Sequence, residues 1–244
     1  MSKPALLLSE TALAEAVGDD LATRVVVELN VRARRVSVRV DPAAGCVVLV
    51  RPARMSDRAV MAFLASRRQW IARHLSTLPP HIAFADGAVI PFAGVDHIVR
   101  HTPETRGGVW RDAERCEIVV TGRPEHLTRR LRDWLKEQAR TQLTQQCLKL
   151  AEDLGAKVTR ISVRDTRSRW GSATRSGRLS FCWRLILAPE AVLAYVAAHE
   201  VAHLRHMDHS LAFWRTVDGL LSGADAASAR AWLRRSGAAL HRYG

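Results

Sequence analysis

Two histidines lie four residues apart, with a glutamate beside the first, in the sequence His199-Glu200-Val201-Ala202-His203. On a helix, side chains four residues apart lie on one face, so both imidazoles can hold a single Zn²⁺ ion. The glutamate can then act as a general base on a water molecule at that metal. The spacing therefore predicts a hydrolytic metal site, with His199 and His203 as ligands and Glu200 as the base.

The residues before this pattern favour a helix that begins near Pro189. Proline is common in the first turn, and the carboxylate of Glu190 suits the positive end of the helix dipole. Between residues 191 and 206 the chain has no glycine or proline. Apolar residues recur on the face that carries the histidines, so the imidazoles would be partly buried. A bound metal would satisfy them there.

A catalytic zinc ion usually takes three protein ligands, and several residues could supply the third. No glutamate follows Glu200, which excludes a downstream glutamate ligand. His209 follows His199 at the spacing seen in enzymes whose chain folds back after the metal helix, so His209 is favoured. Asp218 is the alternative. His206 lies about 10 Å along the helix from His199 and is expected to cap the helix or to support a ligand.

Several motifs in the C-terminal half resemble those of a known family. They are Arg169-Trp170-Gly171-Ser172, the runs 179–189 and 195–203, His209-Ser210 and Phe213-Trp214. In this order they resemble the YgjP-like zinc metallopeptidase family, which is similar in its active-site region to the SprT- and Wss1-type zincin proteases. The resemblance spans residues 24–220. It implies Glu200 as the general base and one Zn²⁺ per chain, with the ligands His199, His203 and His209.

The order of the predicted elements gives an α+β protein, and the resemblance implies that a zincin-like catalytic domain follows a β-rich N-terminal region. Residues 1–22 are expected to form an N-terminal extension that can be mobile. Residues 23–122 are expected to form the β-rich region, with one helix over residues 57–75. The first strands of this region are predicted over residues 24–29, 36–40 and 47–50.

The catalytic domain is predicted over residues 123–244. A helix over residues 124–154 carries a long apolar stripe and is expected to back a small sheet. Strands are predicted on either side of a loop over residues 165–177, and further helices are predicted after the metal helix. These strands cover residues 158–163 and 178–187, and the last helices cover residues 210–221 and 224–240.

The 244-residue chain carries a formal net charge of +13 at pH 7, mostly from clustered arginines. Such a field attracts nucleic acid or nucleotide phosphates, although solvated arginines on ordinary surfaces give the same composition. No recognised DNA-binding motif accompanies the charge. The sequence thus predicts at most non-specific contact with these polyanions.

The four cysteines are scattered without the C-x-x-C spacing of a zinc or redox site. They are Cys46, Cys116, Cys147 and Cys182. The first 22 residues lack the features of a signal peptide, and no apolar stretch is long enough to span a membrane. These features predict a cytoplasmic protein with reduced thiols and no membrane contact.

Three functions are compatible with the pattern. The first is a zinc metallopeptidase that cleaves peptide bonds in a protein or peptide substrate. The second is a metal-dependent nucleoside triphosphate pyrophosphohydrolase, and the third is a non-catalytic basic protein that binds nucleic acid. The intact Glu200 argues against the third. Arg169, Arg184 and Tyr195 are candidate donors to the developing oxyanion.

Overall fold

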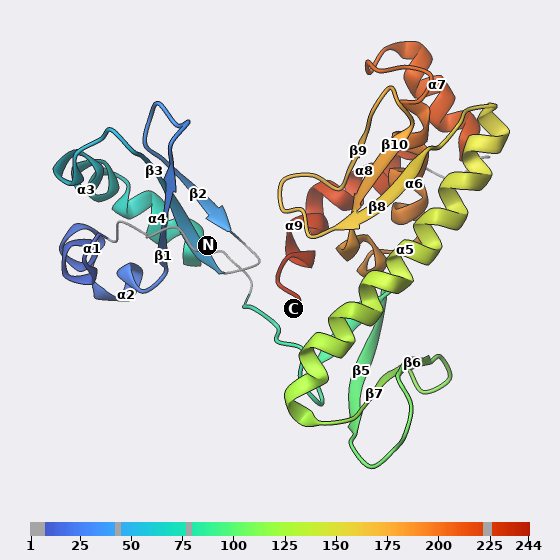
Figure 1. Ribbon diagram of the computed structural model, residues 1–244, viewed down its shortest axis with the longest axis horizontal. Coiled ribbons are helices and arrows are strands. Elements are labelled where there is room, and N and C mark those ends of the chain that lie inside the picture. The colour runs from blue at the N-terminus through green and yellow to red at the C-terminus, as the bar shows by residue number, and fades with distance from the viewer. Residues whose placement is uncertain (1–7, 42–44, 77–79, 222–225) are drawn as a thin grey trace. The chain divides into compact units, whose positions relative to one another are not determined.

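The computed structural model describes residues 8–41, 45–76, 80–221 and 226–244 (Figure 1). The chain divides into two compact units, with the boundary between His81 and Ile82. The predicted division lay after residue 122 instead. The difference arises because the strands between residues 89 and 121 share a hydrophobic core with the long helix that follows them.

The first unit is a three-stranded sheet packed with helices. Its strands are β1 (Val25–Asn30), β2 (Ser37–Asp41) and β3 (Cys46–Pro52), and its helices are α1 (Glu10–Val17), α2 (Asp19–Ala22), α3 (Asp57–Ser66) and α4 (Arg68–Ser76). β3 is central, parallel to β1 and antiparallel to β2. Val47 and Leu49 of β3 are fully buried against Val60, Leu64 and Ile71 of the helices.

Two features of this unit differ from the sequence prediction. Residues 10–22, expected as an extension, form α1 and α2, and Leu13 and Val17 of α1 are buried in the core. The helix predicted over residues 57–75 is divided into α3 and α4, because the chain leaves helical geometry at Arg67, where ψ is 1°.

The second unit contains two small sheets and a long helix (Figure 1). The first sheet has the order β4-β5-β7-β6 and precedes α5. Its strands are β4 (Val89–Phe92), β5 (Val95–Thr102), β6 (Val109–Asp112) and β7 (Glu117–Thr121), and a short 3₁₀ turn over Pro124–His126 leads into α5 (Leu127–Leu154). α5 ends at Gly155, whose φ of 65° places it in the left-handed region that glycine adopts without strain.

The apolar stripe of α5 faces the rest of the unit, as predicted. Its buried residues are Leu127, Leu131, Leu135, Ala139, Leu143, Cys147, Leu150, Ala151 and Leu154. They join one hydrophobic core with residues of the second sheet and of the helix that carries His199. This core fixes the position of the candidate metal helix.

The second sheet has the order β8-β10-β9. Its strands are β8 (Arg160–Arg164), β9 (Gly171–Ala173) and β10 (Arg178–Cys182). β10 ends earlier than the predicted strand over residues 178–187, and a buried 3₁₀ turn, Trp183–Leu187, follows it. The carbonyls of Ile186 and Leu187 in that turn accept hydrogen bonds from the β4–β5 turn. β9 lies within the segment predicted as a loop.

Helices complete the second unit. They are α6 (Glu190–Ala202), α7 (Leu211–Leu220), α8 (Ala226–Trp232) and α9 (Ala238–Leu240), with a π-helical turn over Leu233–Gly237 between the last two. The α+β class predicted from the sequence is confirmed. Within the described ranges, no helix combines the length and apolar character needed to cross a membrane.

Candidate metal centre

The helix α6 carries His199 and Glu200 on its last turn, and His203 is its C-cap. The sequence predicted helix as far as His206, whereas the regular helix ends at Ala202. The amides of Leu204, Arg205 and His206 then form turn hydrogen bonds to carbonyls of α6. This tight turn reverses the chain and returns it to His209.

Three imidazoles meet where the chain folds back. One ring nitrogen from each of His199, His203 and His209 lies within 4.8 Å of the others. The Nε2 atoms of His199 and His209 are 3.2 Å apart. The alternative ligands, Asp218 and His206, do not belong to this group among the described residues.

The turn also orients the ring of His203. Its Nδ1 lies 2.9 Å from the backbone carbonyl oxygen of His206, which can accept a hydrogen bond from it. This bond fixes the proton on Nδ1 and leaves Nε2 with a lone pair for a metal. His206 therefore supports a predicted ligand through its backbone.

The helix α7 packs aromatic rings against all three imidazoles. Ser210 caps α7 by accepting a hydrogen bond from the amide of Phe213. The buried ring of Phe213 lies with its centroid 4.9 Å from that of His199, 4.5 Å from that of His203 and 4.8 Å from that of His209. Trp214 stacks on His209 with the centroids 5.8 Å apart. These rings exclude part of the surrounding water from the three imidazoles.

Burial keeps two of the histidines neutral. The pKa of His199 falls from 6.5 to about 4, mainly through burial and in smaller part because His203, His209 and Arg230 repel a proton. Burial also lowers the pKa of His203, although the bond to His206 opposes that effect. Neutral imidazoles present lone pairs without first losing a proton, as metal ligation requires.

The carboxylate of Glu200 lies beside β9. Burial raises its pKa from 4.5 to about 7, and the nearby charge of Arg169 opposes the rise. A Cβ added at Gly171, the first residue of β9, would lie 2.4 Å from Oε1 of Glu200. Such a contact is far inside van der Waals distance, so only glycine allows β9 to approach the carboxylate this closely.

The chemistry of this cluster fits a divalent metal. Tetrahedral zinc at about 2.05 Å from each nitrogen places neighbouring ligand nitrogens roughly 3.4 Å apart. The separation of 3.2 Å between His199 and His209 is close to that value.

The three candidate oxyanion donors occupy different surroundings. Arg184 is buried, pairs with the carboxylate of Asp165 and donates to the carbonyl of Tyr243, so its guanidinium is already engaged. Tyr195 is buried one turn before His199, with the ring centroids 6.0 Å apart. Arg169 is close enough to lower the pKa of Glu200.

Sequence reasoning missed two residues at this site. Gly171 belongs to the quoted W-G-S motif, but nothing in the motif shows that its missing side chain makes room for Glu200. Arg230 of α8 lies 4.9 Å above the ring of Trp214 and acts electrostatically on His199. It follows Glu200 by 30 residues in the chain, and no spacing signal connects the two.

Comparison with known proteins decides the family. The YgjP-like metallopeptidase domain matches residues 34–236, which is most of the chain. The chain belongs to the YgjP-like family. This YgjP-like protein is accordingly a metal-dependent, metallopeptidase-like hydrolase, and the family implies a divalent metal.

The crystal structure of the metallopeptidase zymogen of Pyrococcus abyssi abylysin is similar to 38% of this chain and 93% of its own, with 20% identity and a TM-score of 0.34. No curated protein matches the chain.

Proposed function

We propose that this YgjP-like protein is a zinc-dependent peptidase in which His199, His203 and His209 bind the metal and Glu200 is the general base. The observation that carries the proposal is the convergence of three imidazole nitrogens within 4.8 Å, beside a buried glutamate on α6. An all-imidazole set of this size suits zinc better than the oxygen-preferring magnesium or calcium.

The role proposed for Glu200 rests on its place on α6 directly after His199, and its raised pKa agrees with that role. A carboxyl group with a pKa of about 7 can both accept a proton and return it near neutral pH. A zinc ion at the histidines would lower the pKa of a water molecule towards 7 and polarise the scissile carbonyl. Glu200 would take a proton from this water molecule as the water attacks the carbonyl carbon of the peptide bond. It would then return the proton to the amine of the leaving product.

The sheet beside Glu200 offers a place for a peptide backbone. β9 pairs with β10 on one side, and no described strand pairs with its other side. An extended peptide can add to such an edge by main-chain hydrogen bonds. Because β9 begins at Gly171, a peptide on this edge would pass next to the carboxylate of Glu200.

The test is cleavage of an unfolded protein, such as casein, by the zinc-loaded full chain and by Glu200→Gln. The variant should bind one zinc per chain and lose cleavage by about a thousandfold, within the usual contribution of a general base. A nucleoside triphosphate assayed in parallel is the control for substrate class. Pyrophosphate release without casein cleavage, or casein cleavage by the variant at the wild-type rate, would refute the proposal.

A further inference from the structure

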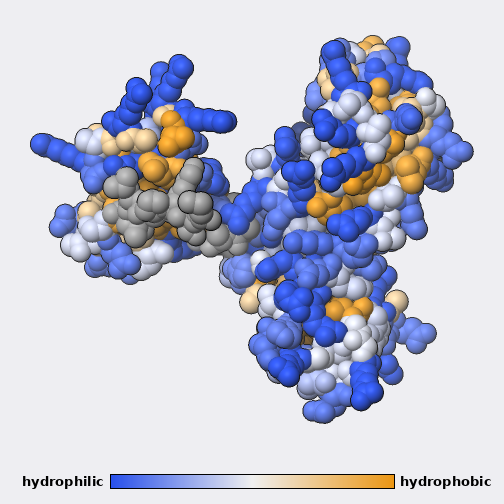
Figure 2. Space-filling view, viewed as in Figure 1, coloured by the Kyte–Doolittle hydropathy of each residue, from blue (hydrophilic) through white to orange (hydrophobic). Residues whose placement is uncertain are grey.

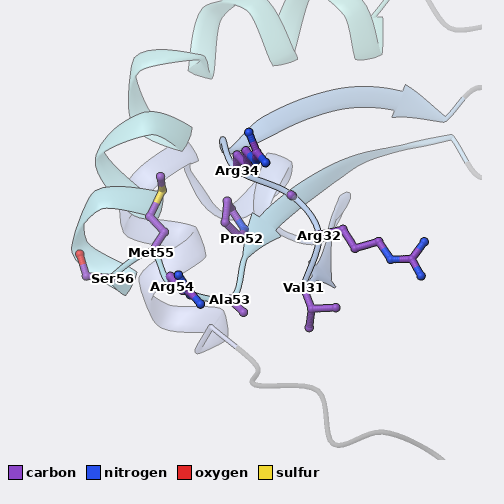
Figure 3. A pocket seen from close by; sticks show the side chains of 9 residues that line it. Val31, Arg32, Arg34, Pro52, Ala53, Arg54, Met55 and Ser56 are labelled. Carbon is purple, nitrogen blue, oxygen red and sulfur yellow. The ribbon is translucent and has the colours of Figure 1, made fainter.

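A cleft opens at one end of the sheet in the first unit. β1 and β3 are parallel, so their C-terminal ends lie at the same end of the sheet. The cleft lies between the segments that follow these two strands and has a volume of about 690 Å³ (Figure 3). Residues 31–34 line it from one segment and residues 52–56 from the other.

Arginines from both segments line this cleft. They are Arg32 and Arg34 after β1, and Arg54 after β3, and all three are exposed. In Figure 3, Arg34 and Arg54 lie on either side of Pro52, and Arg32 extends outward. Two loops therefore bring positive charge to the same opening.

The neighbouring carboxylates leave these arginines unneutralised. Asp57, at the start of α3, pairs with Arg51, and Glu28 of β1 pairs with Arg39. Among the described residues, no side-chain hydrogen bond or ion pair engages the guanidinium groups of the three cleft arginines. Their charge is therefore available to a ligand.

Apart from Ser56, the rest of the lining is apolar, and it contains no aromatic ring. Val31 is 71% exposed, although it is a large aliphatic residue, and Pro52 and Met55 lie opposite in the cleft lining. Figure 2 shows the same mixture on this unit, where strongly hydrophilic side chains project around an apolar patch. Such a lining can contact sugars, and it offers no aromatic ring on which bases could stack.

We propose that this cleft binds the phosphodiester backbone of single-stranded nucleic acid, without base preference. Three unpaired guanidinium groups supply the phosphate contacts, and the aliphatic residues between them accommodate the sugars. Duplex readers insert a helix or a β-ribbon into a groove, whereas this cleft is a concave opening between two short segments. The net charge of +13 adds long-range attraction for a polyanion.

The experiment measures binding of a fluorescein-labelled 20-nucleotide oligothymidine by the full chain, by fluorescence anisotropy between 50 and 300 mM NaCl. The cleft variant replaces Arg32, Arg34 and Arg54 with glutamine. The control variant makes the same change in net charge on the exposed helix residues Arg58, Arg68 and Arg73. Thermal unfolding of each protein establishes that it is folded.

The cleft variant should weaken binding at least about tenfold at the lowest salt and reduce the salt slope by about 2, since each lost phosphate contact removes roughly 0.7 from that slope. The control variant should weaken binding less than threefold. An oligoadenosine and a mixed sequence should bind wild type within threefold of oligothymidine.

Three results would overturn the proposal. One is equal weakening by the two variants, which would assign binding to diffuse surface charge. Another is a failure of the wild-type protein to bind the oligonucleotide at 50 mM NaCl. The third is that the cleft variant loses more affinity for vesicles of phosphatidylglycerol than for the oligonucleotide. That result would identify the ligand as a membrane. None of these readouts depends on peptidase activity, so this proposal and the proposed catalytic function can fail separately.

Discussion

Two histidines of the second unit, the half-buried His199 and the buried His241, are similar in several properties and differ in one. Burial lowers the pKa of both His199 and His241 to about 4, and each has a buried Nδ1 with no hydrogen-bond partner among the described residues. The ring of His199 faces two more imidazoles. The ring of His241 stacks on Trp170 instead, with centroids 5.0 Å apart. A lowered pKa thus reports burial, and convergence of ligand atoms distinguishes a metal site from a packed histidine.

The first test of this comparison removes one histidine from the three-imidazole cluster and, separately, the packed His241. His203→Ala should lower the affinity for zinc by about a thousandfold, because loss of a direct ligand costs more than the 10–100-fold typical of groups that support ligands. His241→Ala should leave the affinity unchanged. Competition with a chromophoric chelator measures both. Equal affinities in the two variants would remove the distinction between the regions.

The second test uses acid. His241 has a pKa of about 4 in the folded protein and 6.5 as its ordinary value, so the unfolded chain takes up its proton first as the pH falls. The stability that this residue contributes is complete above pH 6.5 and is lost between pH 6.5 and 4, by up to about 3 kcal/mol. Arg184 and Arg167 repel the proton and Asp165 attracts it.

Urea unfolding of the zinc-loaded protein between pH 7 and 4 checks this expectation. His241→Gln should lose less free energy of unfolding across that interval than wild type does, because glutamine does not titrate there. Both proteins carry His199, so its protonation and any loss of metal affect them alike, and the difference isolates His241. Parallel curves for the two proteins would contradict the assignment.

The third test concerns the room that Gly171 leaves for Glu200. Gly171→Ala should lower kcat by about a hundredfold, since the added Cβ displaces the carboxylate from its position, and zinc should stay bound. Gly219→Ala is the matched control, because a Cβ there meets no atom within 4 Å. If the two variants had the same kcat, the close approach of β9 would have no catalytic value.

The smallest expected effect belongs to Arg230. Its guanidinium lies over Trp214 and forms no ion pair among the described residues, so it adds unneutralised positive charge beside the histidines. Arg230→Gln should lower kcat/KM by less than about tenfold, because an exposed charge is screened by solvent. Arg230→Lys should recover most of the loss. If the lysine variant were as slow as the glutamine variant, charge would not be the reason.

The sequence predicted the elements whose signals are local. Helical periodicity placed α5 and α6, and alternation placed the three strands of the first unit to within a few residues. His209 could be selected from the amino-acid sequence because its spacing from His199 is typical of a chain reversal after the metal helix. The ligand set stays a prediction until metal is measured.

What the sequence could not show depends on contacts between distant segments. The strand predicted over residues 178–187 ends at Cys182 because the carbonyls of the next turn bond to the β4–β5 turn. β9 has only three residues, too few for a periodic signal. The value of Gly171 is visible only once Glu200 lies beside it.

The hydrogen bond from His203 to the carbonyl of His206 ties one proposed ligand to the turn that positions another, His209. A substitution at the exposed Met207 should leave the path of the turn unchanged, because backbone groups form the hydrogen bonds of the turn. An insertion or a deletion between His203 and His209 shifts the register of the turn and carries one imidazole away from the other two. The length of this segment is therefore under tighter constraint than its composition, and a graft into another scaffold must carry residues 199–209 without a gap.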